Sequence, residues 1–141
     1  MLEKIVYTTS ATAKGGRAGH VKSDDGTVDL QLVVPKEMGG AGGGANPETL
    51  FACGYSACFE GATRRAATLE KVTLGSDTWV KADISIGPRK EGGFQIAATL
   101  HVHLDGVDKE TATKLANRAH TEICPYSHAT RGNIDVTIEI V

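Results

Sequence analysis

The chain has 141 residues, a formal net charge of −2 at pH 7 and a hydrophobic content of 40%, values that predict one globular domain spanning residues 1–141. The small net charge provides no basic field, so neither nucleic acid nor an anionic membrane is favoured as a partner. The N-terminal segment lacks the basic and then apolar pattern of a signal peptide, and no apolar run reaches transmembrane length. We therefore expect a cytoplasmic protein, and in the cytoplasm cysteines are more often catalytic or metal-binding than structural.

The N-terminal third of the chain predicts strands and glycine-rich loops. Short strands are expected at residues 3–13 and 17–22, around a turn that carries Arg17, and a third at residues 27–34. Residues 35–45 are glycine-rich and predict a flexible loop. This loop lacks the Gly-Lys-Ser/Thr ending of a phosphate-binding loop, so we interpret it as a loop over a site.

A long central helix is predicted from Pro47 to about Leu69. Asn46 is a good N-cap, proline is favoured at the first helical position, and Glu48 suits the positive end of the helix dipole. Mostly small residues recur along this helix at spacings of three and four, which predicts a face on which another element packs closely. They are Leu50, Gly54, Ala57, Cys58, Gly61 and Ala62.

The second half of the chain predicts strands, a helix and a last strand. Apolar residues alternate from Val80 to Ile86 and from Phe94 to Leu104. Asp108 is expected to cap a helix that continues to Ile123, before Pro125, and the strand "NIDVTIEIV" closes the chain. This order predicts an α+β fold with mostly antiparallel sheets. With 17 glycines against 3 phenylalanines and 1 tryptophan, the core is one that a second subunit would help to complete.

Three cysteines allow at most one intramolecular pair. On a helix, the five positions from Cys53 to Cys58 turn the side chain by about 140° and advance it by about 7.5 Å, so the two cannot form a disulfide unless the helix breaks. We interpret Cys53 as a buried small apolar residue. Cys124, just before Pro125, is a possible partner for Cys58, and spacing alone leaves that pairing open.

A metal site is the alternative interpretation of Cys124. His120, Cys124 and His128 are spaced by four, which would align them on a continuous helix, but Pro125 interrupts it. A tetrahedral site would need a fourth ligand, and no CxxC or HExxH motif supports one. The candidates for that ligand are His101, His103 and Cys58.

A nucleophilic Cys58 would need a nearby cation. It lies about eleven residues into its helix, whereas the helix dipole acts only over the first turn, so a positive side chain would have to lower the pKa of the thiol. Arg65 is on the same helical face, and Arg17 lies in a glycine-flanked turn that could approach a helix closely. Spacing alone favours a solvated Arg17.

Two motifs, "NPETLFACGYSACF" and "HTEICPYSHATRGN", resemble those of the organic hydroperoxide resistance (Ohr) proteins within the wider Ohr/OsmC family. The resemblance extends over nearly the whole chain, including "YTTSATAKGGRAG", "VPKEMGGAGGGANPE" and the final strand, and Tyr126 after Cys-Pro favours the Ohr branch. It implies an OsmC/Ohr-like fold, with sheets around a long central helix, and an intertwined homodimer.

The resemblance also implies a thiol-dependent peroxidase that acts on organic and fatty-acid hydroperoxides. Cys58 corresponds to the peroxidatic cysteine and Cys124 to the resolving one, Arg17 to the arginine that stabilises the thiolate, and Glu48 to the carboxylate that holds this arginine. The oxidised proteins of this family are reduced by lipoyl-type dithiols, and they use neither metal nor haem, so we expect no cofactor. Cys53 lies outside the catalytic pair.

Met38 in the glycine-rich loop and Phe59 in the central helix are apolar residues that are candidates for favouring alkyl hydroperoxides over hydrogen peroxide. Glu48 and Cys58 are ten residues apart, about 15 Å on one straight helix, so we expect Glu48 to act with the partner subunit's Cys58.

The alternatives to an enzyme are a sensing module whose Cys58 oxidation changes a partner interaction, and a metal-binding protein.

Overall fold

The structure is a computed structural model that describes residues 1–141. The chain forms two compact units, residues 1–50 and residues 51–141. The single-domain prediction is not tested by this grouping and stays a prediction. None of the helices combines the length and the apolar character needed to cross a bilayer.

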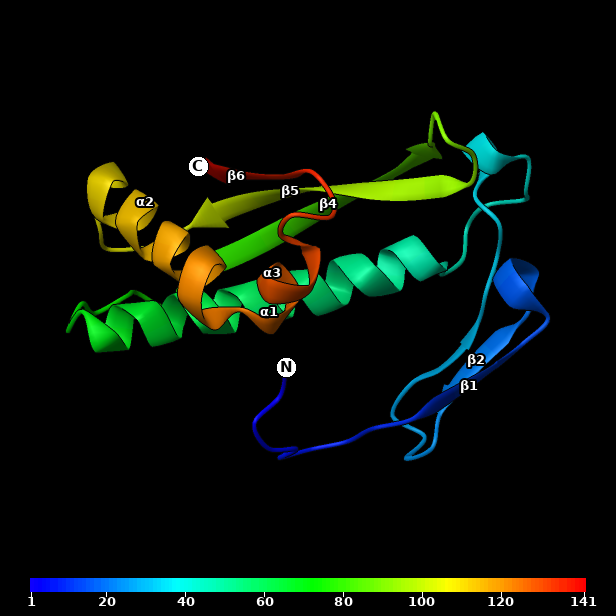
Figure 1. Cartoon of the computed structure of the whole chain (residues 1–141), viewed down its shortest axis with the longest axis horizontal. Coiled ribbons are helices and arrows are strands. Elements are labelled where there is room, and N and C mark those ends of the chain that lie inside the picture. The colour runs from blue at the N-terminus through cyan, green and yellow to red at the C-terminus, as the bar shows by residue number, and fades with distance from the viewer. The chain divides into compact units, whose positions relative to one another are not determined.

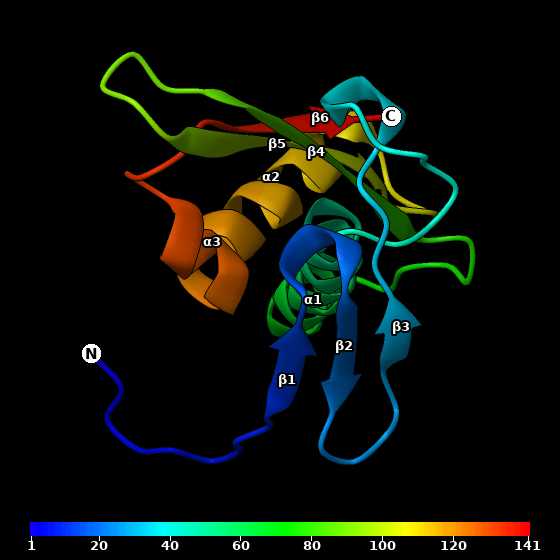
Figure 2. The same cartoon turned by 90° about the vertical axis from the view of Figure 1, so that its right-hand side faces the viewer.

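The first unit contains a small antiparallel sheet of three strands, β1 (Ala11–Lys14), β2 (His20–Ser23) and β3 (Asp29–Gln31), shown in Figure 2. The prediction of a strand over residues 3–13 is wrong before Ala11, where no strand forms. Short 3₁₀ turns at Gly16–Ala18 and Lys36–Met38 complete this unit. The first of them occupies the start of the strand predicted over residues 17–22.

The long helix α1 runs from Pro47 to Leu69, as predicted. The Asn46 Oδ1 atom accepts a hydrogen bond from the Thr49 backbone N–H at 2.9 Å, which satisfies one of the free donors of the first turn. Proline occupies the first helical position, where its missing N–H costs nothing. The start and the end of α1 are therefore both confirmed.

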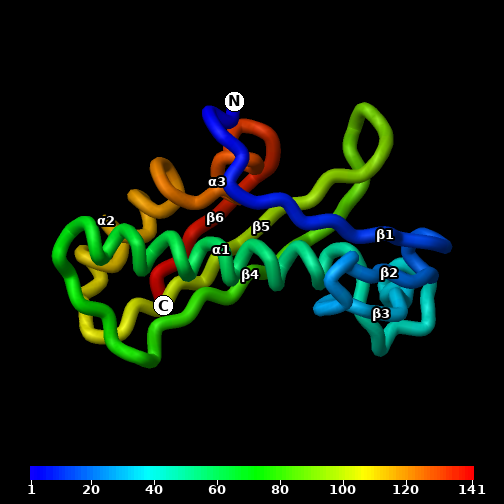
Figure 3. Tube along the Cα trace, turned by 90° about the horizontal axis from the view of Figure 1, so that it is seen from below, coloured from blue at the N-terminus to red at the C-terminus, as the bar shows by residue number.

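The second unit contains the sheet of β4 (Trp79–Pro88), β5 (Phe94–His103) and β6 (Val136–Ile140), with β5 in the centre (Figure 3). Strands β4 and β5 pair antiparallel through a tight turn, whereas β6 pairs parallel with β5. The fold is α+β with mostly antiparallel pairing, as predicted, and the last strand is the parallel exception.

The helix predicted from Asp108 to Ile123 is divided into two elements. Helix α2 spans Lys109–Arg118, and Asp108 caps it by accepting a 2.7 Å hydrogen bond from the Thr111 N–H. The chain then widens into a π-turn, η3 (Ala119–Ile123), and Pro125 begins a further short helix, α3 (Pro125–Thr130). Proline disfavours a helical residue before it and suits the first position of a helix, so it separates the two elements.

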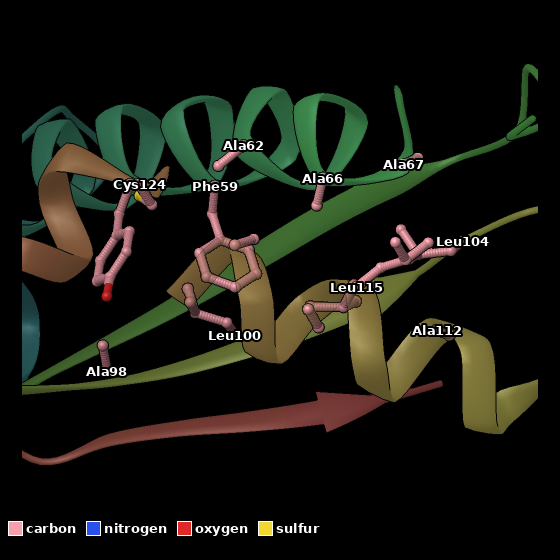
Figure 4. Packing of buried hydrophobic residues seen from close by; sticks show 14 residues of the cluster. Phe59, Ala62, Ala66, Ala67, Ala98, Leu100, Leu104, Ala112, Leu115 and Cys124 are labelled. Carbon is pink, nitrogen blue, oxygen red and sulfur yellow. The ribbon is translucent and has the colours of Figure 1, made fainter. Parts of the chain in front are cut away.

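Helices α1 and α2 cover the same face of the β4–β5–β6 sheet, as seen in Figures 1 and 2. In Figure 4, Phe59 of α1 lies against Leu100 of β5, while the small side chains of Ala62 and Ala66 face the core beside it. Cys124 belongs to the same buried cluster. Small residues thus allow α1 to approach the sheet and α2 closely.

The stripe of small residues predicted on α1 is divided between two faces. Gly54 and Cys58 face elements of the second unit, and Ala62 is buried, whereas Ala57 and Gly61 are exposed. Spacings of three and four spread over more than one face of a helix, so the single stripe was too broad a prediction.

Candidate active site

The sulfur atoms of Cys58 and Cys124 lie 3.5 Å apart. Cys58 comes from the middle of α1 and is half-buried, whereas Cys124 has no exposed surface and lies between the π-turn and α3. The structure thus brings together two thiols that are 66 residues apart in sequence. A disulfide requires an S–S distance of about 2.05 Å, so a shift of about 1.5 Å would join them.

The surroundings of Cys58 within residues 51–141 favour the thiol over the thiolate. Burial raises the pKa of Cys58, and the hydrogen bond and charge of Cys124 raise it further. A hydrogen bond from the backbone N–H of Tyr126 acts in the opposite direction and lowers this pKa, but less than burial raises it. A reactive thiolate at Cys58 therefore needs an additional positive group.

A two-point ion pair joins Arg17 and Glu48 in the first unit. Glu48 accepts hydrogen bonds of 2.8 and 2.6 Å from Nη1 and Nη2 of Arg17, the parallel geometry that guanidinium and carboxylate groups form best. The hydrogen bonds from Arg17 lower the pKa of Glu48, and those to Glu48 raise the pKa of Arg17. The Glu48 side chain is 13% exposed and that of Arg17 is 39% exposed, so the arginine retains accessible surface.

Glycines shape the turn that presents Arg17. Gly15 and Gly16 have φ angles of +79° and +59°, in the left-handed region that side chains disfavour. A Cβ atom at Gly19 would lie 1.8 Å from the backbone oxygen of Lys14. The segment "AKGGRAGH" therefore needs its glycines to hold the Arg17 turn in this conformation.

Two expectations for single residues are wrong. Cys53 is exposed and does not belong to the core. Phe59 has no exposed surface, so it contributes to the core and is not available to contact an alkyl group. In both cases the sequence indicated an apolar helical residue but not which face of the helix carried it.

No group of three or more His, Cys, Asp or Glu side chains is arranged to hold a metal ion. His120 Nδ1 lies 3.0 Å from the Ser127 hydroxyl, and Arg131 donates to His128 Nδ1 at 2.5 Å. The two histidines of the metal alternative are therefore engaged in other hydrogen bonds.

A pocket of about 320 Å³ opens beside Tyr126 in the second unit. Tyr126 lines it, and the N–H of the same residue contacts Cys58. The other lining side chains are mainly apolar or aromatic, with a few polar groups, a composition typical of small-molecule sites. They are Phe51, Gln95, Ile96, Ala129, Thr130, Asn133 and Ile134.

Sequence reasoning missed the structural role of Tyr126. Its ring lies over Gly54, one helical turn before Cys58, and its backbone N–H donates to the Cys58 sulfur. A glycine inside a long helix was the available signal, because it often marks the close approach of another group.

An α+β fold in which a half-buried helical thiol touches a buried thiol defines a small dithiol protein. A family model described as "OsmC-like protein" matches residues 40–139. The chain is 47% identical to an organic hydroperoxide resistance protein of Xanthomonas axonopodis over 98% of this chain and 96% of that protein. It is 44% identical to the organic hydroperoxide resistance protein OhrB of Bacillus subtilis over 96% of this chain and 98% of that one.

A solved structure gives the same result for the fold. The crystal structure of an organic hydroperoxide resistance protein from Legionella pneumophila matches with a TM-score of 0.91 and 46% identity, over 97% of this chain and 98% of that one. The chain belongs to the Ohr/OsmC family.

Proposed function

We propose that the protein is a thiol-dependent peroxidase that reduces organic hydroperoxides, including alkyl and fatty-acid hydroperoxides, to alcohols. The observation that carries the proposal is the 3.5 Å contact between the Cys58 and Cys124 sulfur atoms. Cys58 is the more accessible thiol and Cys124 is buried behind it, an order that suits attack by the first and resolution by the second. The names of the similar proteins indicate the substrate class, organic hydroperoxides.

The reaction has three balanced steps. The Cys58 thiolate attacks one peroxide oxygen, the O–O bond breaks, and the departing alkoxide takes up a proton, which leaves Cys58 as a sulfenic acid. The Cys124 thiol then attacks the Cys58 sulfur, and its proton leaves with the hydroxyl group as water while the disulfide forms. An external dithiol of the lipoyl type reduces this disulfide and is itself oxidised to a cyclic disulfide.

Arg17 is the proposed source of positive charge. A guanidinium beside the Cys58 sulfur would stabilise the thiolate and the negative charge that develops on the departing oxygen. Glu48 holds Arg17 through two hydrogen bonds and so limits the rotamers that the arginine can adopt. We place Glu48 with the partner subunit's Cys58 in an intertwined homodimer.

The pocket beside Tyr126 is the proposed site for the organic part of the substrate. Its volume, about 320 Å³, suits an alkyl or aryl group, and Phe51, Ile96 and Ile134 offer apolar surface. The proposed cycle needs no metal or organic cofactor, and its partners are the hydroperoxide, a lipoyl-type dithiol or lipoylated protein, and a second copy of the chain. We propose the cytoplasm as its location.

Turnover of cumene hydroperoxide with dihydrolipoamide tests the proposal. We expect multiple turnovers for the wild-type protein, none for Cys58→Ser, and one equivalent of peroxide consumed per site for Cys124→Ser without recycling. Absence of turnover in the wild-type protein would overturn the proposal, and a single oxidation without recycling would instead indicate a sensing module. Full turnover in Cys124→Ser would remove this residue from the resolving role.

A further inference from the structure

A buried chain of hydrogen bonds surrounds the segment that carries Cys124. His120 Nδ1 lies 3.0 Å from Ser127 Oγ, and Ser127 Oγ lies 3.2 Å from the Tyr55 hydroxyl. The Tyr55 hydroxyl lies 3.1 Å from Thr130 Oγ1, which donates a 2.9 Å hydrogen bond to the backbone oxygen of Tyr126. Tyr55 and Ser127 have no exposed surface.

The bond from Thr130 to the Tyr126 carbonyl fixes which group donates in every other hydrogen bond of the network. Because Thr130 uses its proton on the Tyr126 carbonyl, it accepts from Tyr55, and Tyr55 in turn accepts from Ser127. Ser127 then accepts from His120, which places a proton on His120 Nδ1. Each hydroxyl donates once and accepts once, so removing one hydroxyl leaves the group that donates to it without an acceptor.

This chain of hydrogen bonds ties together the segments on both sides of the two cysteines. Tyr55 lies one helical turn before Cys58 on α1, His120 lies in the π-turn before Cys124, and Ser127 lies in α3 after Cys124. The last acceptor of this hydrogen-bond network is the Tyr126 carbonyl, and the N–H of the same residue contacts the Cys58 sulfur. Apart from Cys58 itself, no other side chain of α1 forms a hydrogen bond with the π-turn or with α3.

We propose that Tyr55, Ser127 and His120 are positioning residues that fix the distance between the Cys58 and Cys124 sulfur atoms. Cys124 has an extended backbone (φ −70°, ψ 118°) at the junction of the π-turn and α3, where its N–H bonds to the Ala119 oxygen in the π pattern and its carbonyl accepts the first bond of α3 from His128. Without the tie to α1, this junction would sample a wider range of positions, and the sulfurs would spend less time within reach of each other. The rate at which the disulfide closes would fall, because intramolecular reactions depend on such near-attack geometry.

The inference rests on the proposed function for its role in catalysis, but its test needs no peroxide. In a Cys53→Ser background, an aromatic disulfide such as 5,5′-dithiobis(2-nitrobenzoate) reacts in two steps. Cys58 attacks the reagent and releases one aryl thiolate, and Cys124 then attacks the mixed disulfide and releases the second. The first step is bimolecular and the second is unimolecular, so stopped-flow absorbance separates them.

We expect Tyr55→Phe and Ser127→Ala to slow the second step by about three- to tenfold, the effect of one buried hydrogen bond, and to change the first step less than twofold. Thr63→Val is the matched control: Thr63 is a fully buried hydroxyl on α1 that bonds only to the Glu60 carbonyl. It should leave both steps unchanged even if it lowers thermal stability. Thermal unfolding of each variant confirms that it is folded.

Three results would overturn the inference: an unchanged second step in both folded variants, equal slowing of both steps, or the same selective slowing in Thr63→Val. If Tyr55→Phe does not fold, Ser127→Ala alone carries the test, because it removes the hydroxyl that links His120 to Tyr55. A wild-type protein that consumes no hydroperoxide would overturn the proposed function but not the positioning role, because the aryl thiolate release would still report it.

Discussion

Gly54 and Tyr126 are in such close contact that a side chain at Gly54 would clash with the tyrosine. A Cβ atom built there would lie 2.6 Å from the Tyr126 hydroxyl oxygen and 3.1 Å from two of its ring carbons. Gly54 precedes Cys58 by one helical turn, and the Tyr126 N–H contacts the Cys58 sulfur. The glycine thus sets how closely the segment after Cys124 can approach α1.

Gly54→Ala should therefore move Tyr126. We expect the free energy of unfolding to fall by about 1 kcal/mol, because overpacking costs about 1–3 kcal/mol and the gain in helix propensity offsets up to about 1 kcal/mol of it. Displacement of the Tyr126 N–H should also raise the pKa of Cys58 and slow its reaction with peroxide about threefold. Urea unfolding and stopped-flow oxidation measure the two effects.

The double variant Gly54→Ala, Tyr126→Phe is the control. It removes the hydroxyl oxygen, the atom nearest to the new methyl group, so it should recover part of the lost stability relative to Tyr126→Phe alone. If the loss of unfolding free energy in the double variant equals the sum of the losses in the two single variants, the two residues do not clash directly.

The Arg17–Glu48 pair leads to a second prediction. Glu48→Gln retains the shape of the side chain but loses the charge-assisted bonds to Arg17, so we expect the rate of peroxide reduction to fall about tenfold at pH 7. Arg17→Lys should show a similar loss, because an ammonium group cannot make the two-point contact. The exposed pair Arg64–Glu60, also on α1, provides the control, and Glu60→Gln should leave the rate unchanged.

The same pair predicts how stability responds to acid. Arg17 lowers the pKa of Glu48, so the pair is intact above the ordinary glutamate value of about 4.5 and is lost as the pH falls through the lowered pKa. A loss of stability that begins well above pH 4.5 must therefore have another origin. Unfolding curves of wild type and Glu48→Gln should converge only below that pH.

The pocket beside Tyr126 allows a test with substrates of different size. Ala129 lines the pocket and is exposed, so Ala129→Phe should fill the pocket without disturbing the core. We expect the KM for cumene hydroperoxide to rise several-fold, while the rate with hydrogen peroxide, which needs no apolar pocket, stays the same. Equal changes for both peroxides would separate this pocket from substrate binding.

Much of the fold could be predicted from local signals. Asn46, Pro47 and Asp108 marked helix starts, and alternating residues marked β4 and β5, because caps and periodicity depend on neighbours in sequence. The parallel pairing of β6 with β5 depends on contact between segments that are distant in sequence, and the length of β1 depends on how far its pairing with β2 extends. Nothing within residues 3–10 distinguishes an exposed extended segment from a strand, since pairing requires a partner.

The candidate site, too, could be predicted from the sequence only in part. Helical geometry excluded a Cys53–Cys58 disulfide, but spacing could not choose a partner for Cys58, and the contact with Cys124 depends on how α1 packs against the residues around Pro125. Tyr55, Ser127 and Thr130 gave no sequence signal, because single polar residues form a network only when the fold brings them together.

Exposure of Cys53 predicts which thiol stays reactive after oxidation. Cys53 lies on the exposed face of α1, whereas Cys58 and Cys124 touch each other. After one equivalent of cumene hydroperoxide, a maleimide should label one thiol per chain, and peptide mapping should find it at Cys53 with a Cys58–Cys124 disulfide. A label on Cys124 would contradict the assigned pair, and Cys53→Ser should abolish labelling while leaving turnover unchanged.

The pKa of His120 predicts a loss of stability in weak acid. Burial lowers this pKa most, and the positive charges of Arg131 and His128 lower it further, so the folded protein binds a proton at His120 less readily than the unfolded chain does. The stability contributed by neutral His120 is fully present above the unfolded value of about 6.5 and is lost as the pH falls through the lowered, folded value.

We therefore expect the free energy of unfolding of the reduced wild-type protein to decrease from pH 7 to pH 5, and this slope to be smaller in His120→Gln. Glutamine retains a group that can donate to the Ser127 hydroxyl but takes up no proton, so the comparison separates titration from the hydrogen bond itself. Urea unfolding at half-unit pH intervals measures both slopes, and Arg131→Gln should reduce the wild-type slope by a smaller amount, because its charge is the lesser cause. Identical slopes in wild type and His120→Gln would show that another group takes up the proton.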